Sequence, residues 1–263
     1  MKRSDPTNIR IKWMAESLTA WLEEMFRKPI QEWPDECLPD PLDFQEHIQP
    51  QEVRMRMSHG LDCNRAQFYK HHFPEKSKPV EALVNLSQFS LGDFWECWAR
   101  PLIRYYYNET GSMDGWRYEE PMKLEADGIK GTTDGCLTNE VYGEIIVLDF
   151  KKTTDFKIKK AVDGHIPDMP WGHPTQAVNY GEALVEATDE WNAKWIGAIW
   201  PCMVVTKFPP WQFFTFWATR QELDPADRRW VYRQVPDMTA APQGWAFSNF
   251  CKYCEFHDHC GGA

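Results

Sequence analysis

Two carboxylates and one amine stand close together in the stretch of residues 131–153. Asp149 and Lys151 are two positions apart, so both side chains leave the same face if this stretch is a strand. Asp134 lies in the strand expected before it and can pair across to meet them. Carboxylate oxygens hold Mg²⁺ or Mn²⁺, and a lysine can steer or deprotonate an attacking water. The three residues therefore indicate a divalent-metal hydrolase, although an Asp-x-Lys pair alone is often a solvated strand edge.

The elements that must position these residues are expected to be strands. Residues 145–150 form a short apolar run of buried-strand length, and residues 139–143 carry turn-forming residues before it. Residues 118–124 predict the first strand, and residues 195–206 and 211–218 predict two later ones. The pattern is typical of an α/β protein, because helical segments separate these strands.

Helical spacing of apolar residues predicts helices over residues 9–27, 79–109, 173–187 and 223–235, and a further one after Ser58. Glu96 lies inside the apolar stripe of the second of these. A carboxylate in that position is destabilising unless it is paired or bound to metal, so a salt bridge or a metal ligand is expected. Gly92, four residues earlier, would let another backbone come close.

Three cysteines close to the C-terminal end of the chain have the spacing C-x2-C-x5-C: Cys251, Cys254 and Cys260. Such a cluster predicts a metal site. Cys63 is the best candidate for a fourth thiolate, and four thiolates suit an iron–sulfur cluster. Zinc, with His257 or His259 as the fourth ligand, stays open. The other four cysteines, Cys37, Cys97, Cys136 and Cys202, are expected to be structural.

Two segments are basic although the chain has a formal net charge of -10. Residues 151–160 hold five lysines and one aspartate, and residues 53–72 hold Arg65 among other basic residues. Either segment could follow a phosphate backbone, or be an ordinary solvated surface. The overall negative charge argues against a protein that coats DNA through bulk charge and leaves room for a local basic groove.

The 263 residues, 43% of them hydrophobic, can bury one substantial core. No apolar run of about 18 residues predicts a membrane span, and the polar first residues lack the apolar core of a signal peptide. We therefore expect a cytoplasmic protein with no membrane partner. Residues 1–52 are interpreted as a helical and acidic N-terminal extension, and residues 53–263 as one catalytic domain.

These features, in this order, resemble the RecB-like branch of the PD-(D/E)xK nucleases. The resemblance is greatest to its iron–sulfur members, the CRISPR-associated RecB-like exonucleases and the nuclease domain of AddB. It rests on Gly92 with Glu96, Gly131 with Asp134, Asp149 with Lys151, Gln176 with Tyr180, and on Cys63, Cys251, Cys254 and Cys260. Most CRISPR-associated members have His at the position of Glu96, and the acidic extension has no counterpart.

The resemblance implies a restriction-endonuclease-like core, with a central mixed β-sheet flanked by helices and a C-terminal metal-bound tail. It implies that Glu96, Asp134, Asp149 and the Phe150 carbonyl hold Mg²⁺ or Mn²⁺ while Lys151 acts on the water. It implies DNA contacts from Gln176, Tyr180, Lys152, Lys157, Lys159, Lys160 and Arg65, and a 4Fe-4S cluster, with Zn²⁺ as the alternative.

The function implied is a metal-dependent DNA exonuclease that acts on single-stranded DNA or DNA ends, alone, as a homo-oligomer, or with a recombination or CRISPR partner protein. Two alternatives stay open, and a third is disfavoured. The chain could be a structure-specific endonuclease of the same fold, or a non-catalytic metal-stapled module that binds nucleic acid. An iron–sulfur redox protein is disfavoured because the sequence has no G-x-G-x-x-G dinucleotide fingerprint.

Overall fold

The computed structural model describes residues 5–40, 69, 73–76, 82–110, 115–126, 129–154, 173–188, 192–205 and 212–223. The helices in this part of the chain are α1 (Pro6–Arg27), α4 (Ala82–Asn108), α6 (His173–Ala187) and α7 (Arg220–Leu223), with 3-10 turns η1 (Ile30–Glu32), η2 (Asp35–Cys37) and η4 (Pro74–Lys76). The strands are β1 (Arg117–Glu119), β2 (Lys123–Ala126), β3 (Ile129–Thr132), β4 (Gly135–Asn139), β5 (Glu144–Leu148), β6 (Lys151–Thr154), β7 (Lys194–Val205) and β8 (Gln212–Thr219).

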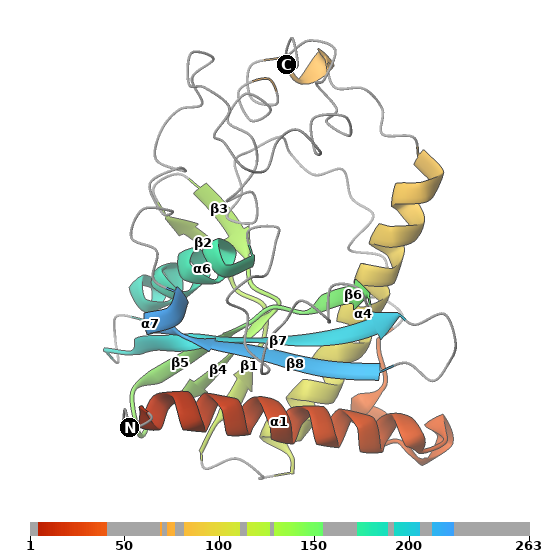
Figure 1. Ribbon diagram of the computed structural model, residues 1–263, viewed down its shortest axis with the longest axis horizontal. Helices are drawn as coiled ribbons and strands as arrows, with labels where there is room; N and C mark the ends of the chain where they lie inside the picture. The colour runs from red at the N-terminus through yellow and green to blue at the C-terminus, as the bar shows by residue number, and fades with distance from the viewer. Residues whose placement is uncertain are drawn as a thin grey trace.

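A mixed β-sheet forms the centre of the described structure (Figure 1). β1, β4 and β5 pair antiparallel, β5 pairs parallel with β7, and β8 pairs antiparallel with the other edge of β7. β6 pairs parallel with the second half of β7, next to the half that pairs with β5. β2 and β3 form a separate two-stranded sheet. The chain is therefore an α/β protein with a mixed central sheet flanked by helices.

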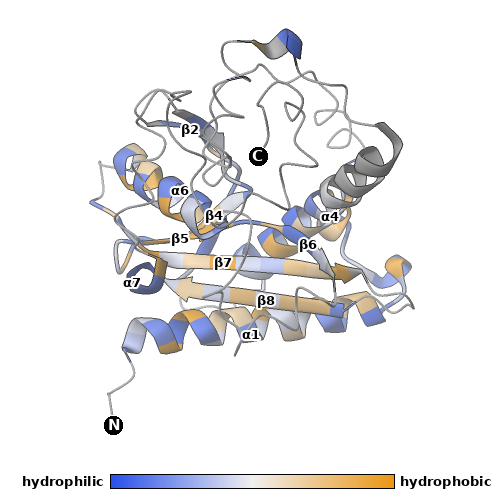
Figure 2. Ribbon diagram, turned by 45° about the horizontal axis from the view of Figure 1, so that its top comes forward, coloured by the Kyte–Doolittle hydropathy of each residue, from blue (hydrophilic) through white to orange (hydrophobic). Residues whose placement is uncertain are grey.

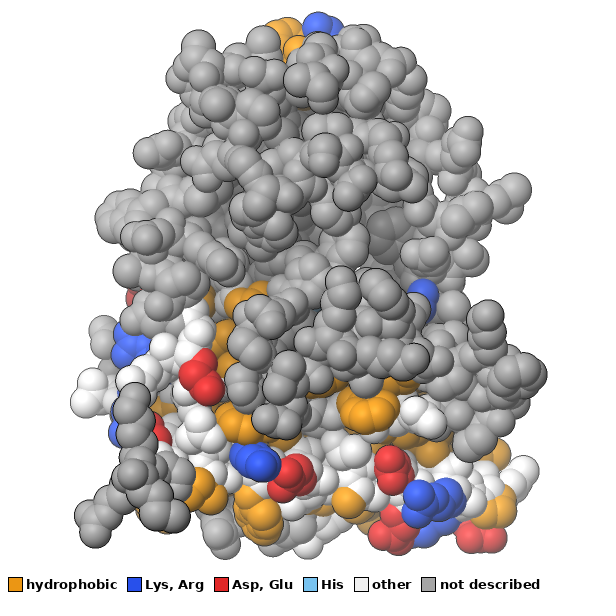
Figure 3. Space-filling model, viewed as in Figure 1, with side chains coloured by type: hydrophobic (Ala, Val, Ile, Leu, Met, Phe, Trp, Pro, Cys, Tyr) orange, Lys and Arg blue, Asp and Glu red, His pale blue; other side chains and the backbone are white. Residues whose placement is uncertain are grey.

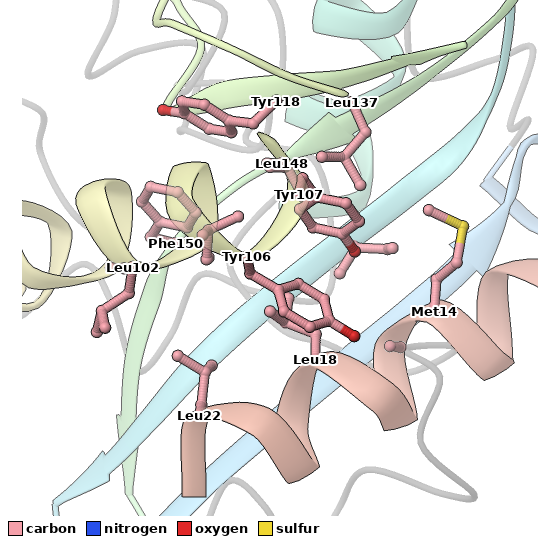
Figure 4. Packing of buried hydrophobic residues seen from close by; sticks show 14 of the residues in the cluster. Met14, Leu18, Leu22, Leu102, Tyr106, Tyr107, Tyr118, Leu137, Leu148 and Phe150 are labelled. Atoms are coloured by element: carbon pink, nitrogen blue, oxygen red, sulfur yellow. The ribbon is translucent and has the colours of Figure 1, made fainter. Parts of the chain in front are cut away.

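Helices cover both faces of this sheet, and β5 explains why its sequence is an unbroken apolar run. Ile146 and Leu148 point into the cluster under α1 and α4, whereas Ile145 and Val147 point into the cluster under α6. Alternate residues of a strand face opposite sides, so a strand covered on both sides must be apolar at every position. Figure 4 shows the first cluster, where Leu148 lies near residues of α1 and α4.

α1 packs along β7 and β8 and belongs to the same core (Figure 2). Its inward positions, at helical spacing, are fully buried, and they include Ile11, Leu18 and Leu22. Its outer face carries charges of both signs along the lower edge of Figure 3, with ion pairs such as Lys28–Glu24 at 2.9 Å. The boundary expected after residue 52 lies outside the described residues.

Several expectations from the sequence are confirmed. The helices over 9–27, 79–109 and 173–187 are α1, α4 and α6, and the β4–β5 hairpin turns at residues 140–143. The two later strands are β7 and β8. The four cysteines expected to be structural are buried thiols. The helix expected after Ser58 lies outside the described residues. Residues 224–235 of the last predicted helix also lie outside them.

One expectation is wrong, and a second finds no support among the described residues. The strand expected over residues 118–124 is split, because β1 ends at Glu119 and β2 begins at Lys123 in a different sheet. Pro121 lies between them, and its missing N–H and fixed φ interrupt a strand ladder. The close backbone approach expected at Gly92 is not seen either. Among the described residues, no atom lies within 4 Å of the position that a Cβ would take there.

α6 lies against β7 through a glycine. A Cβ on Gly181 would overlap the indole of Trp195, which is 3% exposed on β7. The indole itself is fixed, because its Nε1 donates to the Gly197 carbonyl at 2.6 Å. Gly181 therefore sets the distance between α6 and the sheet, and with it the height of the α6 side chains above β5.

Gly181→Ala is expected to lower the free energy of unfolding by about 1–3 kcal/mol, because the indole cannot yield to an added methyl group. Urea denaturation followed by circular dichroism measures this change. Gly92→Ala is the matched control, since it adds the same methyl group to another helix where the described residues leave open space. The control should be neutral or stabilising by up to about 1 kcal/mol. An unchanged Gly181→Ala midpoint would contradict the packing described.

Candidate metal-dependent hydrolytic site

The two residues of the Asp-x-Lys pair lie at an interruption between two strands. β5 ends at Leu148 and β6 begins at Lys151, yet Leu148 pairs with Ile199 and Lys151 with Cys202 at the same offset along β7. The Asp149 amide donates to the Ile199 carbonyl at 3.2 Å. β5 and β6 thus behave as one broken strand, and the spacing of two still directs both side chains to one face, as the sequence predicts.

Asp149 and Lys151 form a tight ion pair. Lys151 Nζ lies 2.6 Å from Asp149 Oδ1, and the exposed fractions of the two side chains are 20% and 0%. Burial by itself lowers the pKa of Lys151, but the nearby Asp149 and Asp134 carboxylates outweigh burial, and the pKa of the amine is raised. Lys151 is therefore a cation here, suited to orient a water or neutralise a phosphate more than to remove a proton.

The α6 side chains expected near the site lie behind Asp149. Gln176 Nε2 lies 3.5 Å from Asp149 Oδ1 and donates to the Tyr180 hydroxyl at 3.1 Å. Gln176 and Tyr180 are 7% and 3% exposed. Burial raises the pKa of Tyr180, and the charges of Asp149 and Asp134 raise it further, so its hydroxyl stays neutral. The pair supports one oxygen of Asp149 from beneath.

Asp134 reaches the pair from the residue just before β4. Its Oδ2 accepts a hydrogen bond from the Phe150 amide at 2.6 Å, across the hairpin. Burial raises its pKa well above the usual range, and the neighbouring carboxylates of Asp149 and Glu96 raise it further, while Lys151 and the Phe150 amide act in the opposite direction. Asp134, Asp149 and Glu96 are therefore close enough for their carboxylates to interact electrostatically.

Glu96 reaches this group of carboxylates from α4. The indole Nε1 of Trp95, next to it, donates to the Pro201 carbonyl at 3.1 Å and fixes this turn of the helix on β7. The Glu96 carboxylate accepts from Arg100 Nη2 at 2.6 Å, and the two side chains are 22% and 16% exposed. The salt bridge and the metal ligand considered from the sequence are therefore both compatible with its position.

The carboxylates fit a divalent cation through one oxygen that has no hydrogen-bond donor among the described residues. Asp149 Oδ2 is buried and has no hydrogen-bond partner among the described residues. A buried carboxylate oxygen needs a donor or a cation, and Mg²⁺ and Mn²⁺ prefer such hard ligands. Within the described residues no set of three or more His, Cys, Asp or Glu side chains is already arranged around one point as metal ligands. Arg100 and the Phe150 amide hold one oxygen each of Glu96 and Asp134.

Two contributors to the site were not anticipated from the sequence. Arg100 forms an ion pair with Glu96. The sequence pattern that could have indicated this contact is an acidic and a basic residue four positions apart on a predicted helix. The Tyr118 hydroxyl donates to the Asp134 carbonyl at 3.2 Å, and its ring occupies the space that a Cβ on Gly135 would need. No local pattern indicated Tyr118, because it approaches from a different strand.

Some expected residues lie outside the described part of the chain. They are the cysteines Cys63, Cys251, Cys254 and Cys260, the alternative ligands His257 and His259, and the basic residues Arg65, Lys157, Lys159 and Lys160. Lys152 is described on β6 and is partly exposed, and burial lowers its pKa. The Phe150 carbonyl stays a predicted ligand.

Within the described residues no helix is long and apolar enough to cross a membrane.

Comparisons with known proteins add little to this geometry. Neither protein-family models nor curated protein sequences match the chain. Among solved structures, the crystal structure of SSO0001 is similar with a TM-score of 0.48 and 17% identity, over 84% of this chain and 94% of that chain. No property of that protein is transferred to this chain at that level of likeness.

Asp134→Asn is expected to stabilise the protein at neutral pH in the presence of a chelator. The raised pKa means that ionisation of Asp134 favours the unfolded chain, so wild-type stability falls as pH rises from the usual aspartate range through the raised pKa. The amide variant carries no such charge and still offers an oxygen to the Phe150 amide. The gain, on the order of 1 kcal/mol at neutral pH, should vanish near about pH 3–4. Thermal unfolding across pH measures it.

Asp149→Asn is the matched comparison and should have the opposite sign. It removes the carboxylate that neutralises Lys151 in a buried place, which is expected to destabilise the protein by about 3 kcal/mol at neutral pH. A stabilised Asp149→Asn variant, or a destabilised Asp134→Asn variant, would contradict the assignment of charges given above.

Proposed function

We propose that this chain is a divalent-metal-dependent DNA exonuclease with a restriction-endonuclease-like core of the PD-(D/E)xK type. The observation that carries the proposal is the Asp149–Lys151 ion pair at 2.6 Å, placed at the broken strand beside Asp134. Asp149 Oδ2, which has no hydrogen-bond partner in the described part of the chain, and the nearby Glu96 charge support it. Residues 53–263 would carry the nuclease site, and residues 1–52 would be an N-terminal extension whose helix α1 packs into the core of the same domain.

The proposed roles follow from the contacts of each side chain. Asp134, Asp149, Glu96 and the Phe150 carbonyl would hold Mg²⁺ or Mn²⁺, which lowers the pKa of a bound water and stabilises charge on the phosphate. Lys151, kept cationic by its carboxylates, would orient that water and neutralise the developing negative charge. Gln176, which donates to the Tyr180 hydroxyl, would help to position Asp149. Phe150 fixes Asp134 through its amide.

Single-stranded DNA or a DNA end is the proposed substrate. Lys152 lies on β6 next to Lys151, and the lysine-rich stretch up to residue 160 follows directly in the sequence. Clustered lysines follow phosphates without reading bases, so binding should be independent of sequence and should weaken with salt. The basic residues Arg65, Lys157, Lys159 and Lys160 are proposed to join Lys152 in this contact.

Lys151→Gln should lower the rate of Mn²⁺-dependent degradation of end-labelled linear single-stranded DNA by about 100-fold or more, because the cation at the phosphate is lost. The glutamine amide can still donate to Asp149, so the fold is expected to survive. Lys130→Gln is the matched control, because Lys130 lies exposed on β3 and pairs with Glu125 at 3.4 Å. Wild-type digestion by the Lys151 variant would refute the role of Lys151. Equal digestion of circular single strands would favour an endonuclease.

A 4Fe-4S cluster held by Cys63, Cys251, Cys254 and Cys260 is proposed to close the domain. It would join segments far apart in the sequence, which removes unfolded-state entropy and makes the cluster structural. Thiolate ligands and a reducing cytoplasm fit each other.

Purified under anaerobic conditions, the protein should be brown and contain about four irons and four sulfides per chain. Cys251→Ser should lose both and lower the thermal midpoint. A colourless wild-type protein with about one zinc per chain would overturn the cluster and favour His257 or His259 as a ligand. That result would leave the hydrolytic site untouched.

A further inference from the structure

Arg100 is the basic group next to the carboxylates that the proposed mechanism does not use. It lies one turn after Glu96 on α4, and its Nη2 is 2.6 Å from Glu96 Oε1. Both side chains are largely buried, with 16% and 22% of their surfaces exposed. An ion pair that is shielded from water interacts more strongly than the same pair on a surface.

Arg100 also acts on the rest of the site. Burial raises the pKa of Tyr118, Asp134 raises it further, and Arg100 lowers it, so Arg100 and Asp134 both lie within electrostatic reach of the one Tyr118 hydroxyl. That hydroxyl donates to the Asp134 carbonyl at 3.2 Å. Counted with Lys151, Arg100 brings the formal charge of the three carboxylates from -3 to -1. Arg100 thereby neutralises part of the negative charge that would otherwise attract a divalent cation.

On its other side, Arg100 lines a depression of about 480 Å³ that has an acidic wall. Asp35 and Glu36 of η2, with Asp40 shortly after it, form that wall. Arg104, one turn further along α4, also lines the depression and pairs with Glu120 at 3.1 Å. Arg100 therefore has carboxylates on two sides, those of the metal site and those of the acidic wall.

We propose that Arg100 is a positioning residue that competes with the divalent cation for Glu96. Before the cation binds, the guanidinium holds Glu96 and offsets the repulsion among the three carboxylates. A cation that takes the Glu96 carboxylate meets the positive charge of Arg100, and the guanidinium turns toward the acidic wall. The proposal rests on the proposed metal-dependent function, and it makes metal affinity depend on Asp35 and Glu36, which bind no metal.

Mn²⁺ binding to the purified full chain, measured by titration with electron paramagnetic resonance detection, tests this directly. Arg100→Gln should bind Mn²⁺ on the order of tenfold more tightly than wild type, because one buried positive charge is gone. Arg100→Lys keeps the charge and should stay near the wild-type affinity. Arg104→Gln removes the same charge from the next turn of α4 and should change little. Unchanged or weaker Mn²⁺ binding by Arg100→Gln overturns the proposal.

The acidic wall is tested by the double variant Asp35→Asn, Glu36→Gln, which alters two exposed side chains and is expected to fold normally. It should bind Mn²⁺ several-fold more weakly, since the acidic wall loses two of its three negative charges. If this variant binds Mn²⁺ with wild-type affinity, the proposed movement of Arg100 is wrong.

Failure of the underlying function has a different signature. If wild type binds no Mn²⁺, the metal site itself is refuted, and the Arg100 proposal with it. If wild type binds Mn²⁺, Asp149→Asn abolishes binding and Arg100→Gln has no effect, the Arg100 proposal alone is overturned.

Discussion

The repulsion among carboxylates in a largely buried place is the constraint on which the rest of the site depends. Asp149 has none of its side-chain surface exposed, and burial, followed by the charges of Asp149 and Glu96, raises the pKa of Asp134. Such a cluster is tolerated when each member has a compensating group. Lys151, the Phe150 amide and Arg100 supply that compensation from three different directions.

These groups lie where the regular β-structure is interrupted. β7 continues while β5 breaks off and resumes as β6, so Asp149 lies in the break with its register intact. Helices on both faces of the sheet bury everything else on β5, as the two clusters around Ile145 and Ile146 show. α4 is fixed to β7 by Trp95, and α6 lies close because Gly181 has no side chain.

Local pattern was enough for the parts of the site that lie within one element. Asp149 and Lys151 share a face because strand alternation survives the break, and Gln176 contacts Tyr180 because four residues make about one helical turn. The split of the first expected strand also has a local cause, because Pro121 interrupts a strand ladder. Tyr118 left no such signal, because its partner Asp134 is distant in sequence and lies just before the neighbouring strand β4.

The sequence by itself determined the α/β class, the long helices, the hairpin and the identity of the four charged groups, because periodicity and turn chemistry act over a few neighbouring residues. Only the tertiary structure decided which oxygens are occupied: Glu96 on Arg100, Asp134 on the Phe150 amide, and Asp149 with Oδ2 left without a partner among the described residues. Those choices depend on burial and on charges brought together from separate helices and strands, and the field at one carboxylate is a sum over groups that no short window of sequence contains.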